Sequence, residues 1–293
     1  MRRIPTRLTP SEYRFVETHL RVINTQLIYH TKSLSFFIDA PPTAESSMSL
    51  KLTARNHQSE LMDDPSIDEY AHRHALASLG RINWFSRSDK AIWNSILRLT
   101  KPGNSEQPLT ILDIAAGGGD LAIRLSCRAQ RDGVSVSIDG CDISQTALKF
   151  ATDQAMTTKR DNVRFFQCDA LNQPFPQRQY DVVMCSLFLH HLKEEDAVLL
   201  LQRMKAAATQ LVLVDDLRRT RFGYWLAWLG CRLLSRCHVV HADGPMSVEG
   251  AFTTSEAQSI AVKAGLANAD LRHHWPQRFL LTWRPGTGDQ NVS

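Results

Sequence analysis

The most constraining feature of the chain is a short apolar segment followed by three glycines and a helical pattern. Residues 110–114 are β-branched and apolar apart from one acid, which is typical of a buried parallel strand. Gly117, Gly118 and Gly119 follow, and glycine permits a tight turn and the close approach of a ligand to the backbone. The helix expected after them directs unpaired N–H groups toward the same point. The segment therefore predicts a strand–turn–helix unit that cradles a nucleotide-like cofactor.

Two classes of cofactor are compatible with this turn. The segment from Gly117 to Ala122 matches the G-x-G-x-x-A pattern of dinucleotide-binding proteins, which is a weak signal on its own. Asp113, however, places a carboxylate inside the strand, four residues before Gly117. A negative charge there opposes a pyrophosphate but suits a cationic ligand. S-adenosylmethionine carries both a sulfonium and an ammonium group.

The strand and turn resemble the first motif of class I S-adenosylmethionine-dependent methyltransferases, in which an acid precedes three alternating glycines. The residues that carry this resemblance are Asp113, Ala115, Gly117 and Gly119. Ala115 stands where the first glycine is expected and narrows the room near the amino-acid end of the cofactor. The resemblance covers residues 109–283 and implies that all four residues bind S-adenosylmethionine.

Acids at the ends of the following strands support this resemblance. Asp142 closes a strand predicted over residues 134–141, at about the distance from the glycine turn expected for a ribose-binding acid. Asp169 follows a strand over residues 163–168, and the resemblance implies that an acid here meets the adenine amino group. The neighbouring residues predicted to bind the cofactor are Ile143, Ala170 and Ser186.

The alternation of strands and helices predicts an α/β fold with a doubly wound, mostly parallel, seven-stranded sheet. Two final strands, over residues 271–275 and 278–283, resemble the terminal antiparallel hairpin of the family. The predicted domains are a partly disordered N-terminal extension (1–56), a helical cap or lid (57–105), the cofactor-binding methyltransferase core (106–286) and a loose tail (287–293). Helices before the first strand commonly form a lid in this family; a packing appendage is the alternative.

His190 and His191 are the candidate general bases, because they follow the fourth predicted strand, over residues 180–185, on the expected substrate side. A neutral imidazole with a pKa near 6.5 is suited to this work. The alternative is that these histidines only support a loop. The spacing of histidines, cysteines and acids predicts no metal site.

Four aromatic side chains are candidates for contact with the acceptor: Trp84, Phe222, Trp225 and Trp228. The last three lie on one predicted helix after the fifth strand, behind Arg218, Arg219 and Arg221. They could line an apolar pocket, contact a membrane surface, or belong to the ordinary core.

The acceptor predicted from the sequence is a small molecule. The Asn/Asp-Pro-Pro-aromatic segment of amino-methylating nucleic-acid enzymes is absent, since residues 185–188 read Cys-Ser-Leu-Phe, and no nucleic-acid partner is expected. Residues 60–65, 79–83, 216–219 and 243–247 resemble methyltransferases encoded beside type III polyketide synthases and, more distantly, those of quinone biosynthesis. The resemblance implies a lipophilic phenolic or polyketide-like acceptor, with O-methylation favoured. The alternatives are an NAD(P)-dependent oxidoreductase and a non-catalytic cofactor-binding protein.

Composition adds two expectations about the protein's environment. The six cysteines lack the C-x-x-C spacing of metal and redox sites, which favours reduced thiols and a cytoplasmic location, and no signal peptide is evident. The longest apolar run, residues 222–231, is too short to span a bilayer. The sequence carries no signal for the oligomeric state.

Overall fold

The structure is a computed structural model that describes residues 52–64, 67–99 and 107–286. Most of the predicted N-terminal extension, the predicted boundary near residue 105 and the predicted tail lie outside the described residues. None of the described helices is long and apolar enough to cross a membrane. All six cysteines are free thiols.

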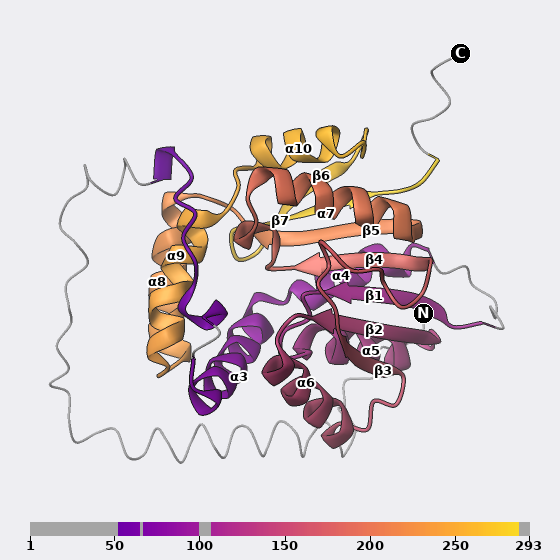
Figure 1. Cartoon of the computed structure of the whole chain (residues 1–293), viewed down its shortest axis with the longest axis horizontal. Coiled ribbons are helices and arrows are strands. Elements are labelled where there is room, and N and C mark those ends of the chain that lie inside the picture. The colour runs from indigo at the N-terminus through magenta and orange to yellow at the C-terminus, as the bar shows by residue number, and fades with distance from the viewer. Residues whose placement is uncertain (1–51, 65–66, 100–106, 287–293) are drawn as a thin grey trace, which may run out of the picture. The chain divides into compact units, whose positions relative to one another are not determined.

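A seven-stranded sheet forms the centre of the fold, as predicted (Figure 1). Its strands in chain order are β1 (Leu109–Ile114), β2 (Val136–Asp142), β3 (Val163–Gln167), β4 (Tyr180–Ser186), β5 (Ala208–Leu217), β6 (Asp270–His274) and β7 (Arg278–Trp283). They lie in the order β3-β2-β1-β4-β5-β7-β6. The first five strands are parallel, and β7 runs antiparallel to both β5 and β6. The doubly wound, mostly parallel fold and its closing antiparallel pair are therefore confirmed.

The central strands carry apolar side chains on both faces of the sheet, and helices cover both faces. Successive side chains of a strand point to opposite sides, so Ile111 and its neighbour Leu112 enter two different cores. The helices that contribute to these cores are α4 (Ser88–Leu97) and α5 (Asp120–Asp132) on one face and α7 (Glu194–Ala207) and α10 (Thr254–Lys263) on the other. α6 (Gln145–Thr157) packs beside β2 and β3.

Several helix ends follow from local chemistry. Ser144 caps α6, because its hydroxyl accepts a hydrogen bond from the Ala147 N–H, 3.2 Å away. α10 ends just before Gly265, whose φ of +78° is the left-handed conformation in which glycine commonly ends a helix. α3 (Glu69–Ser86) and α4 are separate helices because Arg87 between them is left-handed, with φ +54°.

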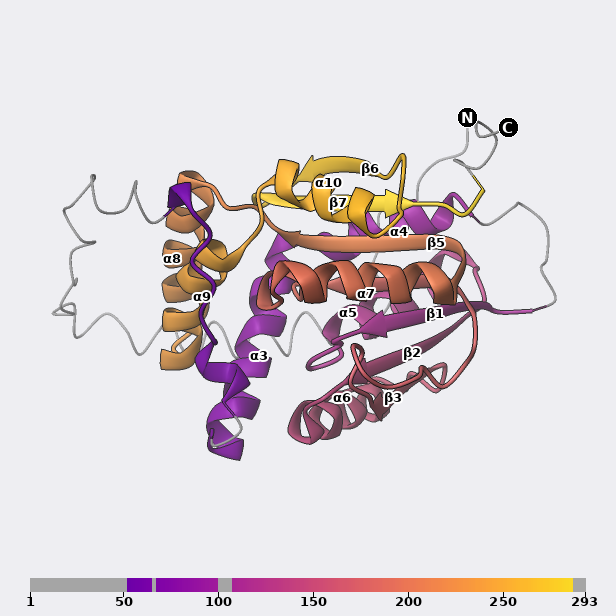
Figure 2. The ribbon, with the colours of Figure 1, turned by 45° about the horizontal axis from the view of Figure 1, so that its top comes forward.

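Three helices, α3, α8 (Arg221–Leu234) and α9 (His238–Gly250), lie together beyond the carboxyl ends of the parallel strands (Figures 1 and 2). α3 rests on the glycine turn, since a Cβ built on Gly118 would lie 3.6 Å from Leu76 Cβ. α4, which belongs to the same predicted cap, packs instead on a face of the sheet through Ile92, Trp93 and Ile96. Only part of the predicted cap therefore lies at the carboxyl edge.

The sequence gives no prediction of α9, because Asp-Gly-Pro at residues 243–245 is typical of a turn. Tertiary packing explains the helix. Gly244 faces Cys231 of α8 so closely that a Cβ there would overlap the sulfur atom. Glycine at this position therefore lets the two helices pack together, although it disfavours a helix in isolation.

Candidate active site

The candidate site lies where the chain order of the sheet reverses, between β1 and its neighbours β2 and β4. Ligands of open α/β sheets bind beyond the carboxyl ends of strands at such a point. Asp113 in β1 is aligned with Gly140 in β2, and Asp142 at the end of β2 is aligned with Gln167 in β3. The predicted acids are thus brought to neighbouring positions along one edge.

Asp113 is a buried acid, and one of its carboxyl oxygens makes no hydrogen bond within the described part of the chain. Its side chain is 2% exposed, and Oδ2 has no hydrogen-bond partner among the described residues. Burial raises the pKa of this carboxyl well above its usual range, and the charges of Asp120 and Asp142 raise it further. A buried carboxyl oxygen without a partner is unfavourable, so the position suits a ligand that brings a cation or a hydrogen-bond donor.

The glycine turn follows Asp113 in an unusual backbone conformation. Ala115, Gly117 and Gly119 have φ values of +55°, +52° and +74°. A Cβ built on Gly117 would meet no atom within 4 Å, whereas one on Gly119 would lie 2.5 Å from Phe165 Cζ. Gly117 therefore faces open space at the edge of the sheet, and Gly119 is needed for packing beneath the turn. Ala115 accepts a conformation that glycine adopts more readily.

Asp142 is tied to the turn through backbone hydrogen bonds. The Gly117 N–H donates to Oδ2 and the Ser144 N–H to Oδ1, both at 2.9 Å. Burial raises the pKa of Asp142, and these two bonds oppose the increase. Each carboxylate oxygen keeps a further acceptor position, and the adjacent Ile143 side chain is exposed. The pair can therefore present a carboxylate and an apolar surface to a nucleoside.

Asp169 and Ser186 have partners within the protein. The Asp169 carboxylate accepts the Leu171 N–H at 2.9 Å and the Asn172 side-chain amide at 2.8 Å, and the Asn172 bond is the main reason for its lowered pKa. Ala170 beside it is buried. The Ser186 hydroxyl donates to Asp215 Oδ2 at 2.9 Å. The structure thus places Asp169 at the same edge of the sheet as Asp142. Its carboxylate, however, already accepts hydrogen bonds from the loop that follows it.

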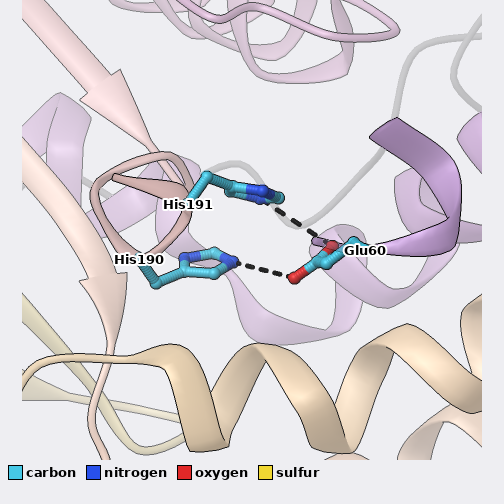
Figure 3. Close-up of side chains that lie close together, drawn as sticks. All are labelled: Glu60, His190 and His191. Carbon is cyan, nitrogen blue, oxygen red and sulfur yellow. Dashed lines mark ion pairs between the residues drawn. The ribbon is translucent and has the colours of Figure 1, made fainter. Parts of the chain in front are cut away.

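His190 and His191 form part of a 3-10 turn, η2 (Leu189–His191), directly beyond β4. His190 is buried, and its Nδ1 lies 2.6 Å from Asp216 Oδ1. Burial opposes its charged form, but Asp216 and Glu60 raise the pKa of His190 to about 10. His191 Nδ1 lies 2.8 Å from Asp63 Oδ2. Both Nε2 atoms face Glu60, as Figure 3 shows.

The predicted acceptor residues lie on two helices. Trp84, near the end of α3, is 61% exposed and packs edge-on against Phe85. Phe222 and Trp225 on α8 are also exposed, and Trp225 contacts Trp228 edge-on. The exposure of Trp84, Phe222 and Trp225 shows that these three are not ordinary core residues, whereas Trp228 is half-buried.

The comparisons with known proteins agree with this geometry. A family model described as a methyltransferase domain matches residues 111–210. The ubiquinone/menaquinone biosynthesis C-methyltransferase UbiE of Azotobacter vinelandii is 26% identical over 185 residues, which are 62% of this chain and 66% of that relative. Residues 111–210 therefore match a methyltransferase domain, and the chain is similar to class I S-adenosylmethionine-dependent methyltransferases.

Other similar proteins extend the comparison. A 2-phytyl-1,4-naphtoquinone methyltransferase of Nostoc is 29% identical over 38% of this chain and 47% of its own. The same fold is found in a putative O-methyltransferase from Nostoc punctiforme, with a TM-score of 0.55 at 19% identity over 81% of this chain and 66% of that chain. An O-methyltransferase family 2 protein from Planctomyces limnophilus, in complex with apigenin, also has a TM-score of 0.55 at 19% identity, over 82% and 67%. The match to the UbiE relatives spans just under two thirds of their length.

The residues at the switch point fit S-adenosylmethionine, the cofactor of this class of methyltransferases. This fit is supported by the Asp113 carboxyl, whose buried Oδ2 has no hydrogen-bond partner in the described part of the chain, and by the open space that a Cβ on Gly117 would meet. A ligand with an ammonium group would supply the missing charge, whereas a pyrophosphate would add a second negative group. The geometry thus favours the methyltransferase over the dinucleotide alternative.

Sequence reasoning did not identify Glu60 and Asp216 as partners of the two histidines. Glu60 precedes them by 130 positions in the chain, and no spacing connects it to η2. The resemblance to polyketide-associated methyltransferases did include Glu60, Asp216 and Asp243, without assigning them roles. In the structure all three lie around η2, because Asp243 accepts the N–H groups of Leu61 and Met62 and so holds the Glu60 segment.

Proposed function

We propose that the protein transfers the methyl group of S-adenosylmethionine to a small, lipophilic phenolic or polyketide-like acceptor. The observation that carries this proposal is the buried, unpartnered carboxyl of Asp113 beside the glycine turn and Asp142. When bound, the cofactor supplies an electrophilic methyl group on its sulfonium. The chain has to bind the cofactor, orient the acceptor and exclude water, and positioning alone can lower a barrier by about 7–11 kcal/mol.

Some of the proposed cofactor contacts are electrostatic or hydrogen-bonded, and others depend on the space that the glycine turn leaves for the ligand. Asp113 compensates the positive charge of the amino-acid portion, and Asp142 accepts hydrogen bonds from the ribose hydroxyls. Gly117, whose missing side chain leaves open space, lets the ligand approach the backbone. Ala115, Gly119, Ile143, Asp169, Ala170 and Ser186 remain the other predicted cofactor residues. The Asp169 carboxylate would have to share its loop contacts with the adenine.

We propose that His190 and His191 position the acceptor side of the site rather than remove a proton. Both Nδ1 atoms have carboxylate partners, and both Nε2 atoms face Glu60. His190 is also protonated at neutral pH in the absence of another cation, because its pKa is raised to about 10 by Asp216 and Glu60 against the effect of burial. A general base contributes roughly 10²–10⁴-fold, so a reactive phenolic acceptor can be methylated without one.

Oxygen is the proposed acceptor atom, and a ring carbon is the second candidate. The sequence resemblance favours O-methylation, whereas the curated UbiE relatives are named C-methyltransferases. Incubation with S-adenosylmethionine and a panel of lipophilic phenols, followed by NMR of the product, separates a methyl ether from a C-methyl ring. We expect a methyl ether. A protein that binds the cofactor but methylates no acceptor in a broad panel would be the non-catalytic alternative.

Asp142→Ala is expected to weaken the binding of S-adenosylhomocysteine by one to two orders of magnitude. The substitution removes the ribose acceptor and the partner of the Gly117 N–H, which lies 2.9 Å from the carboxylate. Isothermal titration measures the affinity, with Asp153→Ala, an exposed acid on α6, as the matched control. Equal affinities for the two variants would contradict the proposed role. Saturable binding of NADH with no response to S-adenosylhomocysteine would contradict the cofactor assignment.

We propose that α8 also contacts a membrane surface, from which a lipophilic acceptor could be drawn. Phe222, Trp225, Leu229 and Leu233 recur at helical spacing, and all four are exposed. Arg232 lies over the Trp228 ring at 4.2 Å and adds positive charge to this helix. Sedimentation with phosphatidylglycerol vesicles should retain the protein, and Leu233→Glu should reduce the bound fraction several-fold. Binding that is unchanged by this variant would show that α8 is not the contact.

A further inference from the structure

Glu60, His190 and His191 form a compact group of side chains at the carboxyl edge of the sheet (Figure 3). One potential ligand atom from each residue lies within 4.8 Å of the others. Glu60 and His190 are buried, and His191 is half-buried. Three side chains from two distant segments therefore direct nitrogen and oxygen atoms toward one small volume.

The distances within this group are too long for charged hydrogen bonds. His190 Nε2 lies 3.5 Å from Glu60 Oε1, and His191 Nε2 lies 3.8 Å from Glu60 Oε2. Hydrogen bonds between ionised nitrogen and oxygen are typically about 2.7–2.9 Å long. Two ligands of a tetrahedral zinc ion are separated by roughly 3.3–3.4 Å, because each lies about 2.0–2.1 Å from the metal. The first separation is close to that value, and the second, which is measured to the other oxygen of the carboxylate, exceeds it by a few tenths of an ångström.

The outer nitrogens of both rings are already paired with carboxylates. His190 Nδ1 lies 2.6 Å from Asp216 Oδ1, and His191 Nδ1 lies 2.8 Å from Asp63 Oδ2. Histidines that bind a metal usually donate the N–H of the other ring nitrogen to a carboxylate or carbonyl, which orients the ring. With the proton on Nδ1, each Nε2 presents a lone pair toward Glu60.

A lone pair on each Nε2 cannot form a hydrogen bond with the Glu60 carboxylate, since both groups are acceptors. A proton on His190 Nε2 would pair this nitrogen with Glu60, but their separation of 3.5 Å is longer than a charged hydrogen bond. A second proton on His191 would place two imidazolium ions at a ring-centroid distance of 4.3 Å, where they repel each other. One divalent cation between the three groups satisfies both neutral imidazoles and the carboxylate together.

We propose that Glu60, His190 and His191 bind a divalent transition-metal ion, with zinc favoured by the two imidazoles and one carboxylate. Three protein ligands leave a fourth coordination position for water or another oxygen ligand. The ion would also fix the segment around Glu60 onto η2, to which Arg55 already binds through the carbonyl oxygens of His190 and Leu192 at 2.8 and 2.7 Å. The proposal concerns metal binding and does not depend on methyl transfer.

Cobalt(II) titration of the full chain, prepared without a histidine tag and treated with a chelator, tests the site. We expect one equivalent to produce the visible absorption of a tetrahedral nitrogen–oxygen site and one equivalent of zinc to abolish it. Glu60→Gln and His191→Asn should weaken zinc binding at least tenfold. His241→Asn is the matched control, because His241 bonds the Ser235 carbonyl outside this group.

A further variant tests the site without replacing a buried side chain, so that a loss of metal binding can be distinguished from a loss of folding. Asp63 has a half-exposed side chain that contacts the outer nitrogen of His191, so Asp63→Ala should keep the fold while weakening zinc binding by roughly 10–100-fold. Far-UV circular dichroism checks that each variant is folded. The absence of a cobalt spectrum would overturn the proposal, since Glu60, His190 and His191 would then interact through hydrogen bonds and charge without a metal ion. Binding that is equally strong in the Glu60, His191 and Asp63 variants would also overturn it, as an ion bound elsewhere.

Discussion

Replacing Arg278 by methionine is expected to lower the free energy of unfolding by about 3–5 kcal/mol, because it leaves a buried carboxylate without its main counter-charge. Asp215 is fully buried, and Arg278 Nη1 donates to its Oδ2 at 2.8 Å. The same guanidinium donates to Ser88 Oγ and Asn83 Oδ1, so it also ties the junction of α3 and α4 to the sheet. Urea denaturation followed by circular dichroism measures the change.

The matched control for this substitution is Arg272→Met. Arg272 pairs with Asp270 at 2.6 Å on the same hairpin, but the side chains are 64% and 51% exposed. Exposed pairs contribute about 0–1 kcal/mol, so this variant should differ little from the wild type. A loss in Arg278→Met no larger than in Arg272→Met would show that the buried pair does not support the fold.

The pH dependence of stability gives a second test of the same pair. Burial alone would raise the pKa of Asp215, but Arg278 and His274 lower it to about 2. The stabilisation from the ionised carboxylate is therefore complete above the unfolded pKa of about 3.9 and is lost as the pH falls toward 2. In Arg278→Met the carboxylate should take up a proton at a higher pH. The stability gap between variant and wild type should accordingly narrow on acidification.

Gly119→Ala is expected to destabilise the protein by roughly 2–5 kcal/mol, from left-handed backbone strain and from overpacking. Gly119 has φ +74°, and an added Cβ would lie 2.5 Å from Phe165 Cζ and 2.8 Å from Ala151 Cβ. Ala151 is buried on α6, so relief requires the helix to move. Thermal or urea unfolding measures the loss.

Gly117→Ala separates backbone strain from packing. Gly117 has φ +52°, but its added Cβ would meet no atom within 4 Å. We expect a loss of only about 1–2 kcal/mol, the left-handed backbone penalty alone. S-adenosylhomocysteine should nevertheless bind more weakly, because the methyl group occupies the space proposed for the cofactor. If both glycine variants lost the same stability, packing beneath the turn would not explain the conformation.

The sequence determined the architecture because its signals are local. A buried strand, a glycine turn and a capped helix each depend on neighbouring residues, so the succession of strands and helices along the chain and the family resemblance could be predicted without coordinates. The acids at the ends of β1, β2 and β3 were also predictable, since carboxyl ends of parallel strands share one edge.

Only the tertiary structure decided which charged groups meet. Glu60, Asp216 and the two histidines come from separate segments, and no periodicity links their positions. The same is true of the Asp215–Arg278 pair, which spans 63 positions of the chain. α9 also depends on packing, because Gly244 and Pro245 disfavour a helix until α8 lies against it. Local patterns fix elements through short-range sterics and hydrogen bonds, whereas long-range ion pairs form only once the fold has brought their segments together.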